Sequence, residues 1–168
     1  MKKLVILTAT FVIVFFSACK KDPLDIPLGT ISVSINGTET TFNLQSKALL
    51  TNSAGYNTLT IHGYKKYTSA NSTQIELIIT SLNPISSGIF SENTAASSGN
   101  VRINFFQEFV LGLGTGYFTY GSPTNLCTIN IASITGTSVK GSFKGELRAG
   151  GSAGETATLS RGVFNVSF

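Results

Sequence analysis

The most constraining feature of this sequence is an alternation of apolar and polar residues with a period of two, which recurs from Gly29 onward. It is clearest at 139–148, where Val139, Phe143 and Leu147 face away from four charged positions. Successive side chains of a strand point to opposite faces, so the pattern predicts strands with one buried and one solvated face. Only residues 45–51 are compatible with a helical turn.

The alternating runs lie between clusters of Gly, Ser, Asn and Pro. They occur at 31–35, 39–44, 59–62, 73–81, 101–105, 127–131, 139–148 and 164–168. Asn36-Gly37 separates the first two runs and is a strong hairpin signal, because both residues tolerate the positive φ of a type I′ turn. We expect an all-β, antiparallel domain, a β-sandwich of about eight to ten strands, with a closed or partly open β-barrel as the alternative.

The first residues carry a different signal. Lys2 and Lys3 precede the apolar run 4–16, which is too short for a transmembrane helix of about 20 residues. The residues that follow, Phe16-Ser17-Ala18-Cys19, resemble a bacterial lipobox, in which the peptide is cut before the cysteine and that cysteine is lipidated. The sequence therefore predicts a lipoprotein signal peptide at 1–18, the lipidated Cys19 with a tether at 19–28, and a single all-β domain at 29–168.

The tether predicts where the domain is held. Pro23 and Pro27 favour an extended chain, and the charged residues around them keep it solvated. Two or more acyl chains hold a protein stably on a bilayer, so the membrane is an expected partner through the lipid on Cys19. The lysines and acids after Cys19 resemble the surface-export signals of Bacteroidetes lipoproteins. We expect a location on the bacterial outer membrane, on its periplasmic face or at the cell surface.

The charge balance argues against a nucleic-acid partner. Removal of Lys2 and Lys3 with the signal peptide lowers the formal net charge from +4 to +2. Lys65-Lys66 is the only basic pair beyond the tether, whereas nucleic-acid binders carry extended basic patches.

Several short segments resemble a known family. They are ISVSINGTETTF at 31–42, LTIHG at 59–63, SGIF at 87–90, VKGSF at 139–143 and SRGVFNVSF at 160–168. Together they are similar to landmarks of small Bacteroidetes lipoproteins of the DUF6252-like type. The resemblance implies a β fold and an envelope location, and it brings no activity, ligand or cofactor.

The inventory of reactive groups is small. No Asp follows Asp25, which excludes a Ser-His-Asp triad within the domain, and His62 is the only histidine. No cluster of His, Cys and carboxylates supplies a metal site, and we expect no cofactor. Cys127 lies on an apolar strand face, and no second cysteine remains for a disulfide once Cys19 is lipidated, so we expect a buried, inert thiol. These residues favour a protein that is not an enzyme.

One aromatic stretch is the candidate ligand surface. Residues 105–120 combine six aromatic side chains with the glycines of Gly112-Leu113-Gly114-Thr115-Gly116, which predict a flexible connection between strands. The candidate residues are Tyr117, Phe118, Tyr120 and Glu108, the last a carboxylate among apolar neighbours.

The predicted function is that of an envelope-anchored, non-enzymatic binding or accessory module, with a glycan, a lipid or a protein as ligand. One alternative is a hydrolase of an envelope or dietary polymer that uses Glu108, Glu76 or His62. Another is an inhibitor-like or assembly protein that uses the segment 110–120. A barrel with an apolar cavity favours a lipid or small-molecule carrier instead. The sequence leaves the oligomeric state open.

Overall fold

A computed structural model of the 168-residue chain describes residues 24–68, 72–91, 100–110, 113–119, 127–150 and 155–168. This part of the chain contains strands and no helix. The strands are β1 (Thr30–Ile35), β2 (Thr38–Phe42), β3 (Leu44–Ser53), β4 (Tyr56–Tyr67), β5 (Ser72–Ser81), β6 (Gly88–Ser91), β7 (Asn100–Val110), β8 (Leu113–Phe118), β9 (Thr128–Ile134), β10 (Ser138–Ala149) and β11 (Thr156–Ser167).

The prediction of an all-β, antiparallel domain is confirmed, with two differences in detail. The described residues form eleven strands, more than the predicted eight to ten. Residues 45–51, for which a helical turn was the alternative, lie inside β3. The only parallel pairing among the described strands joins β11 to β3 at Ser167 and Lys47.

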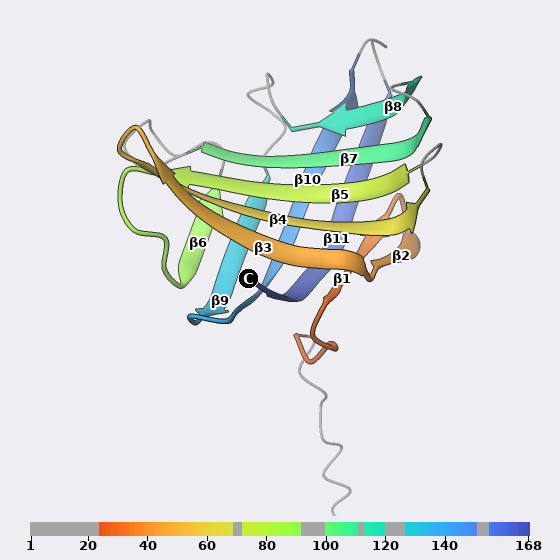
Figure 1. The fold of residues 1–168 in the computed structure, drawn as a ribbon. Coiled ribbons are helices and arrows are strands. Elements are labelled where there is room, and N and C mark those ends of the chain that lie inside the picture. Colours follow the sequence, from red (N-terminus) through yellow and green to blue (C-terminus); the bar gives the residue numbers. More distant parts are fainter. Residues whose placement is uncertain (1–23, 69–71, 92–99, 111–112, 120–126, 151–154) are drawn as a thin grey trace, which may run out of the picture.

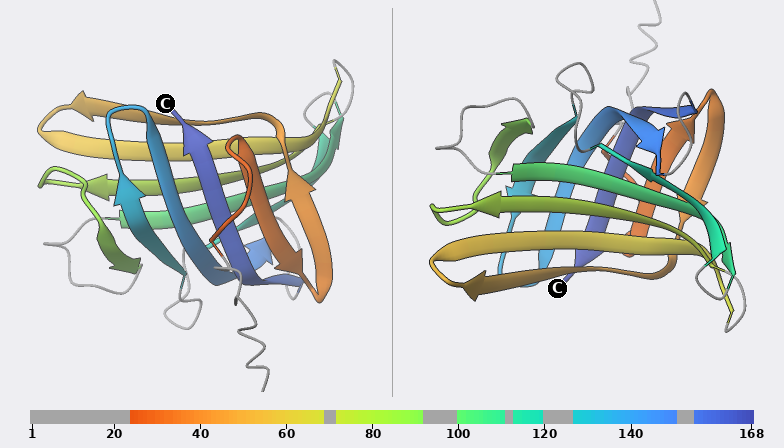
Figure 2. Two further views of the ribbon diagram at one scale, coloured as in Figure 1. Left: turned by 90° about the horizontal axis from the view of Figure 1, so that it is seen from below. Right: turned by 90° about the horizontal axis from the view of Figure 1, so that it is seen from above.

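The eleven strands form one hydrogen-bonded network that folds into two layers. One layer has the order β3-β4-β5-β7-β8 and the other the order β6-β9-β10-β11-β1-β2. The strands of one layer run across those of the other (Figure 1, Figure 2). Short pairings of β10 with β8 and of β11 with β3 join the layers at two corners. The architecture is thus a two-layered sandwich with barrel-like corners.

The predicted hairpin at Asn36-Gly37 has the expected geometry. Asn36 has φ +49° and Gly37 has φ +85°, as a type I′ turn requires. The turn is also tied to the C-terminal strand, because the Thr158 N–H donates to Asn36 Oδ1 at 2.8 Å. The strongest local signal in the sequence therefore fixes the β1–β2 pairing.

The space between the layers is filled by the apolar side chains that the alternation predicted. Almost all of them are buried, whereas Ile35 is half-buried and Phe168 is 40% exposed. The largest fully buried side chains are Ile31, Phe42, Leu59, Ile61, Ile75, Leu77, Ile79, Ile103, Ile129, Ile131, Leu147 and Phe164.

Glycines on the inner faces of β10 and β11 make room for phenylalanine rings. Gly141 lies opposite Phe164, and Phe143 lies opposite Gly162. A Cβ atom on Gly141 would come within 2.5 Å of the Phe164 ring, and one on Gly162 within 2.8 Å of the Phe143 ring. Each ring therefore occupies the volume that a larger residue on the neighbouring strand would need.

Candidate functional site

A row of polar side chains crosses the outer face of the β3-β4-β5-β7-β8 layer. Lys47 is paired with His62, His62 with Glu76, and Glu76 with Asn104, each on the neighbouring strand. Neighbours in register share a face of the sheet, and the alternating core residues occupy the inner face. We call these four residues the polar row. It places a cation, an imidazole, a carboxylate and an amide side by side.

The members of the polar row interact. The Asn104 Nδ2 amide donates a hydrogen bond of 2.8 Å to Glu76 Oε2, which orients the carboxylate. The pKa of His62 is lowered from 6.5, first because partial burial disfavours the charged imidazole and second because Lys47 repels it. Glu76 opposes this shift, since its carboxylate attracts the imidazolium. His62 is therefore a neutral hydrogen-bonding group at neutral pH.

Aromatic rings lie along one side of the polar row and at its β8 end, on the same face of the sheet. On β4, Tyr64 lies next to His62 with ring centroids 6.1 Å apart, and next to Tyr67 with centroids 4.8 Å apart. On the β7–β8 side, Phe106 and Phe118 make an edge-to-face contact with centroids 5.5 Å apart. Tyr67 is 54% exposed, and the other three rings are half-buried. The outer face thus presents apolar rings beside hydrogen-bonding groups.

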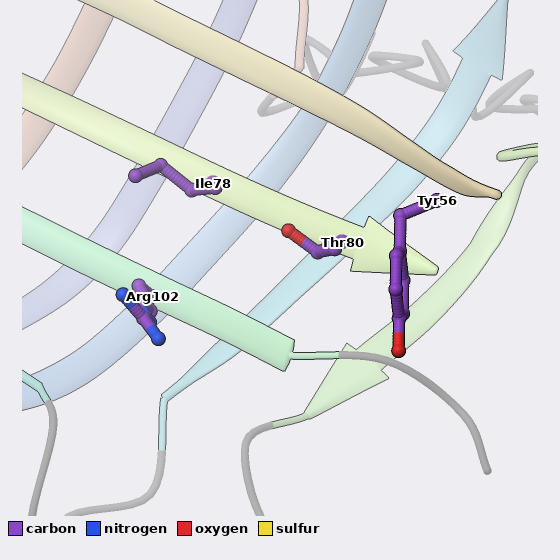
Figure 3. Close-up of a pocket in the computed structure, with 4 residues that line it drawn as sticks. All are labelled: Tyr56, Ile78, Thr80 and Arg102. Atoms are coloured by element: carbon purple, nitrogen blue, oxygen red, sulfur yellow. The ribbon is translucent and has the colours of Figure 1, made fainter. Parts of the chain in front are cut away.

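A small pocket lies at another part of this face. Ile78 and Thr80 on β5, Arg102 on β7 and Tyr56 on β4 surround a volume of about 320 Å³ (Figure 3). The Tyr56 ring stands beyond Thr80, and the Arg102 guanidinium lies beside Ile78, its register partner (Figure 3). The pocket adds a cation and a phenol to the groups that the outer face offers to a ligand.

The predicted ligand residues do not all gather on this face. Tyr117 turns inward and stacks on Phe105 with centroids 5.8 Å apart, whereas Phe118 turns outward toward Phe106. Tyr117 and Phe118 are consecutive in β8, so they lie on opposite faces of the sheet. Tyr120 and the side chain of Glu108 lie outside the described residues. The expected connection at 112–116 includes the start of β8.

The structure brings together two of the three predicted hydrolase residues. His62 and Glu76 are register partners, but neither lines any of the pockets described here. Cys127 is fully buried, and its thiol is 3.6 Å from the Val101 carbonyl oxygen, in the core and away from His62 on the outer face. Within the described ranges, no group of three or more His, Cys, Asp or Glu residues is placed to hold a metal ion.

A second surface lies on the outer face of the other layer. It is a groove of about 680 Å³ over β9, β10 and β11, with Leu24 and Ile89 among its walls and Lys144 and Arg161 as its cations. Arg161 also forms an ion pair of 2.6 Å with Glu39. This groove opens at the surface, and the buried apolar side chains lie between the two layers.

The last residues of the predicted tether are bound to this second layer. The Asn165 side-chain amide donates to the Ile26 carbonyl at 2.8 Å, and the Gly29 N–H donates to the Asn165 carbonyl at 2.8 Å. The Asn165 side chain lies on the outer face of β11, between the buried Phe164 and Val166, and Leu24 lines the groove on that same face. The chain thus enters the domain on the face remote from the polar row.

Sequence reasoning identified His62 and Glu76 singly and missed the row that they form with Lys47 and Asn104. The missing information was the register between strands, which depends on bulges such as the one between Tyr64 and Lys66. The alternation gave the outward face of His62, Glu76 and Asn104 but not their neighbours across the sheet. Lys47 lies in the stretch 45–51, for which a helical turn was the alternative, so its face was not predicted.

Comparison with known protein families, with curated proteins and with solved structures found no match to this chain. Among the residues that the structure describes, no helix is both long and apolar enough to cross a membrane.

Proposed function

We propose that this protein is an envelope-anchored, non-enzymatic binding module that presents the outer face of the β3-β4-β5-β7-β8 layer to a glycan. The observation that carries the proposal is the polar row with aromatic rings along one side of it and at its β8 end. The apolar faces of sugar rings pack on aromatic side chains, and sugar hydroxyls pair with carboxylate, amide and imidazole groups. An extended, open face suits a chain of sugars better than a single small molecule.

The proposed anchor is the lipid on Cys19, in a lipoprotein similar to the DUF6252-like proteins of Bacteroidetes and located on the outer membrane. The lipobox-like residues before Cys19 support this part of the proposal. The entry of the chain on the layer opposite the polar row is consistent with it, because the proposed ligand face then points away from the anchor.

The ligand face is tested with the full chain on a glycan array. We expect binding to a subset of glycans, lost in Tyr67→Ala and in Glu76→Gln. Ile89→Ala is the matched control, because Ile89 is 73% exposed on the other layer. Absence of glycan binding by the unmodified chain, or equal binding by all three variants, would contradict the proposed face.

The anchor is tested separately by fractionating cells that express the full chain. We expect the protein to sediment with membranes and to carry the mass of attached acyl chains, and Cys19→Ala to lose both. Continued membrane association of Cys19→Ala without acyl mass would refute lipid anchoring and leave the glycan test intact.

A hydrolase is the second candidate, favoured by the pairing of His62 with Glu76. A carboxylate beside an imidazole is an arrangement that general acid–base catalysis uses. This candidate predicts new reducing ends from a bound glycan, with release abolished in both His62→Gln and Glu76→Gln. Binding without release supports the non-enzymatic module.

A further inference from the structure

Three neighbouring strands change from apolar to polar on their inner faces at the same level of the sandwich. On β4 the inner positions run Leu59, Ile61, Gly63 and then Lys66, which lies opposite Thr73. On β5 they run Ile79, Leu77, Ile75 and then Thr73, and on β7 they run Val101, Ile103, Phe105 and then Gln107. Gly63, Ile75 and Phe105 are in register, so the polar residues form the next level. Where the inward-facing residues of three neighbouring strands change from apolar to polar at the same level, the space that they face is expected to contain water.

The β1–β2 hairpin closes this level into a pocket. Ile35, Asn36, Thr38 and Thr40 contribute to the same volume of about 440 Å³ as the ends of β4, β5 and β7. The pocket lies where the β1–β2 hairpin meets β4, the strand of the other layer that β2 contacts. Its floor includes the buried Phe105, and Thr40 is only 8% exposed. Its size is within the range of small-molecule sites, about 300–1,000 Å³.

The charged residues that line this pocket are Lys65 and Lys66, the basic pair that the sequence singled out. A register shift between Tyr64 and Lys66 inserts an extra residue in β4, so that two consecutive lysines line one cavity. The ion pair that the structure describes, between Arg161 and Glu39, involves neither lysine. The remaining polar lining consists of the hydroxyls of Thr38, Thr40 and Thr73 and the amides of Asn36 and Gln107.

We propose that this pocket, which we call the lysine pocket, binds a hydroxylated anion of monosaccharide size that carries a carboxylate or a phosphate. The two ammonium groups complement the anionic group, and the threonine hydroxyls and the Gln107 amide pair with ligand hydroxyls. Phe105 provides an apolar surface for the ring of the ligand. The site is separate from the outer face that carries the polar row, since Lys66, Thr73 and Gln107 follow the core side of their strands.

The experiment measures the Tm of the full chain with glucuronate, glucose 6-phosphate or neutral glucose. A ligand present at about 100 times its Kd raises the Tm of a protein of this size by roughly 5–10 °C. We expect this increase with one or both of the two anions and no increase with glucose. The double variant Lys65→Gln/Lys66→Gln is expected to lose the increase.

Lys140→Gln/Lys144→Gln is the matched control, because it removes the same charge from β10 on the other layer and is expected to keep the increase. The relative response to glucuronate and to glucose 6-phosphate distinguishes a carboxylate from a phosphate ligand. An equal increase with glucose, an equal loss in both double variants, or no increase with either anion would overturn the proposal. Tyr64→Ala changes the outer face and is measured in the same assay. If this variant keeps the increase in Tm with the anions, the lysine pocket binds them independently of the proposed glycan face.

Discussion

Replacing Gly141 by alanine is expected to be one of the most damaging single changes in the core. Gly141 lies in the middle of β10, opposite Phe164, whose side chain is fully buried. A Cβ atom at this position would overlap the backbone carbonyl of Asn130 on β9 and come within 2.5 Å of the Phe164 ring. Neither obstacle is the end of a flexible side chain, so relief requires movement of a strand or of a core ring.

The size of the effect follows from this geometry. Overpacking of a well-filled core costs about 1–3 kcal/mol, and the upper end applies here because one obstacle is backbone. For a protein of this size, a loss of about 3 kcal/mol lowers the Tm by roughly 6–12 °C. Gly136→Ala is the control, since a Cβ atom on Gly136 meets nothing within 4 Å, and its stability is expected to stay within about 0.5 kcal/mol of the original.

The assay is urea unfolding followed by circular dichroism, with thermal unfolding as a second measure. A double-mutant cycle with Phe164→Leu separates the ring contact from the backbone contact, because Phe164→Leu should cost less in the Gly141→Ala background than alone. A Gly141→Ala variant as stable as Gly136→Ala would show that β9 and β10 separate freely. That result would refute the explanation that glycine is required at these positions to leave room for the phenylalanine rings.

Three further predictions concern the hairpin, the histidine and the thiol. Gly37→Ala should lower the free energy of unfolding, measured in urea, by about 1 kcal/mol, because Gly37 has φ +85°, which disfavours a residue with a side chain. A free energy of unfolding equal to that of the original protein would show that the turn tolerates a side chain. Because the pKa of His62 is lowered from 6.5 in the folded protein, its contribution to stability is complete above pH 6.5 and is lost as the pH falls through 6.5 toward the folded pKa. The Tm of His62→Gln should therefore fall less than that of the original protein between about pH 7.5 and pH 5.5, and an identical fall would contradict the shift. The fully buried Cys127 should react with a thiol reagent only on unfolding, and rapid labelling of the native protein would show that the core opens there.

The parts of the fold that the sequence predicted are those that local patterns determine. The alternation of Val139, Phe143 and Leu147 on β10 needs no partner strand to be recognised, and the Asn36-Gly37 turn is a property of two residues. The spacing role of Gly141 could not be predicted, because it depends on the ring of Phe164 on another strand.

The candidate site shows the same limit. The outward direction of His62 and Glu76 followed from alternation, but their pairing depends on the register of β4 and β5. Tyr117 and Phe118 were grouped because both are aromatic, whereas a strand directs consecutive side chains to opposite faces. Once residues 113–118 are known to form β8, that separation follows directly.

The pairing of β1 with β11 has a consequence for how the chain reaches its folded state. Thr30 is in register with Asn165, and β11 also contacts β10 and β3, so the last strand completes both the second layer and one corner. Contacts between such distant parts of a chain form slowly and cannot form before the C-terminal strand has been synthesised. A nascent polypeptide with this topology stays incompletely folded until β11 has been synthesised, so its second layer is the part of the sandwich that closes last.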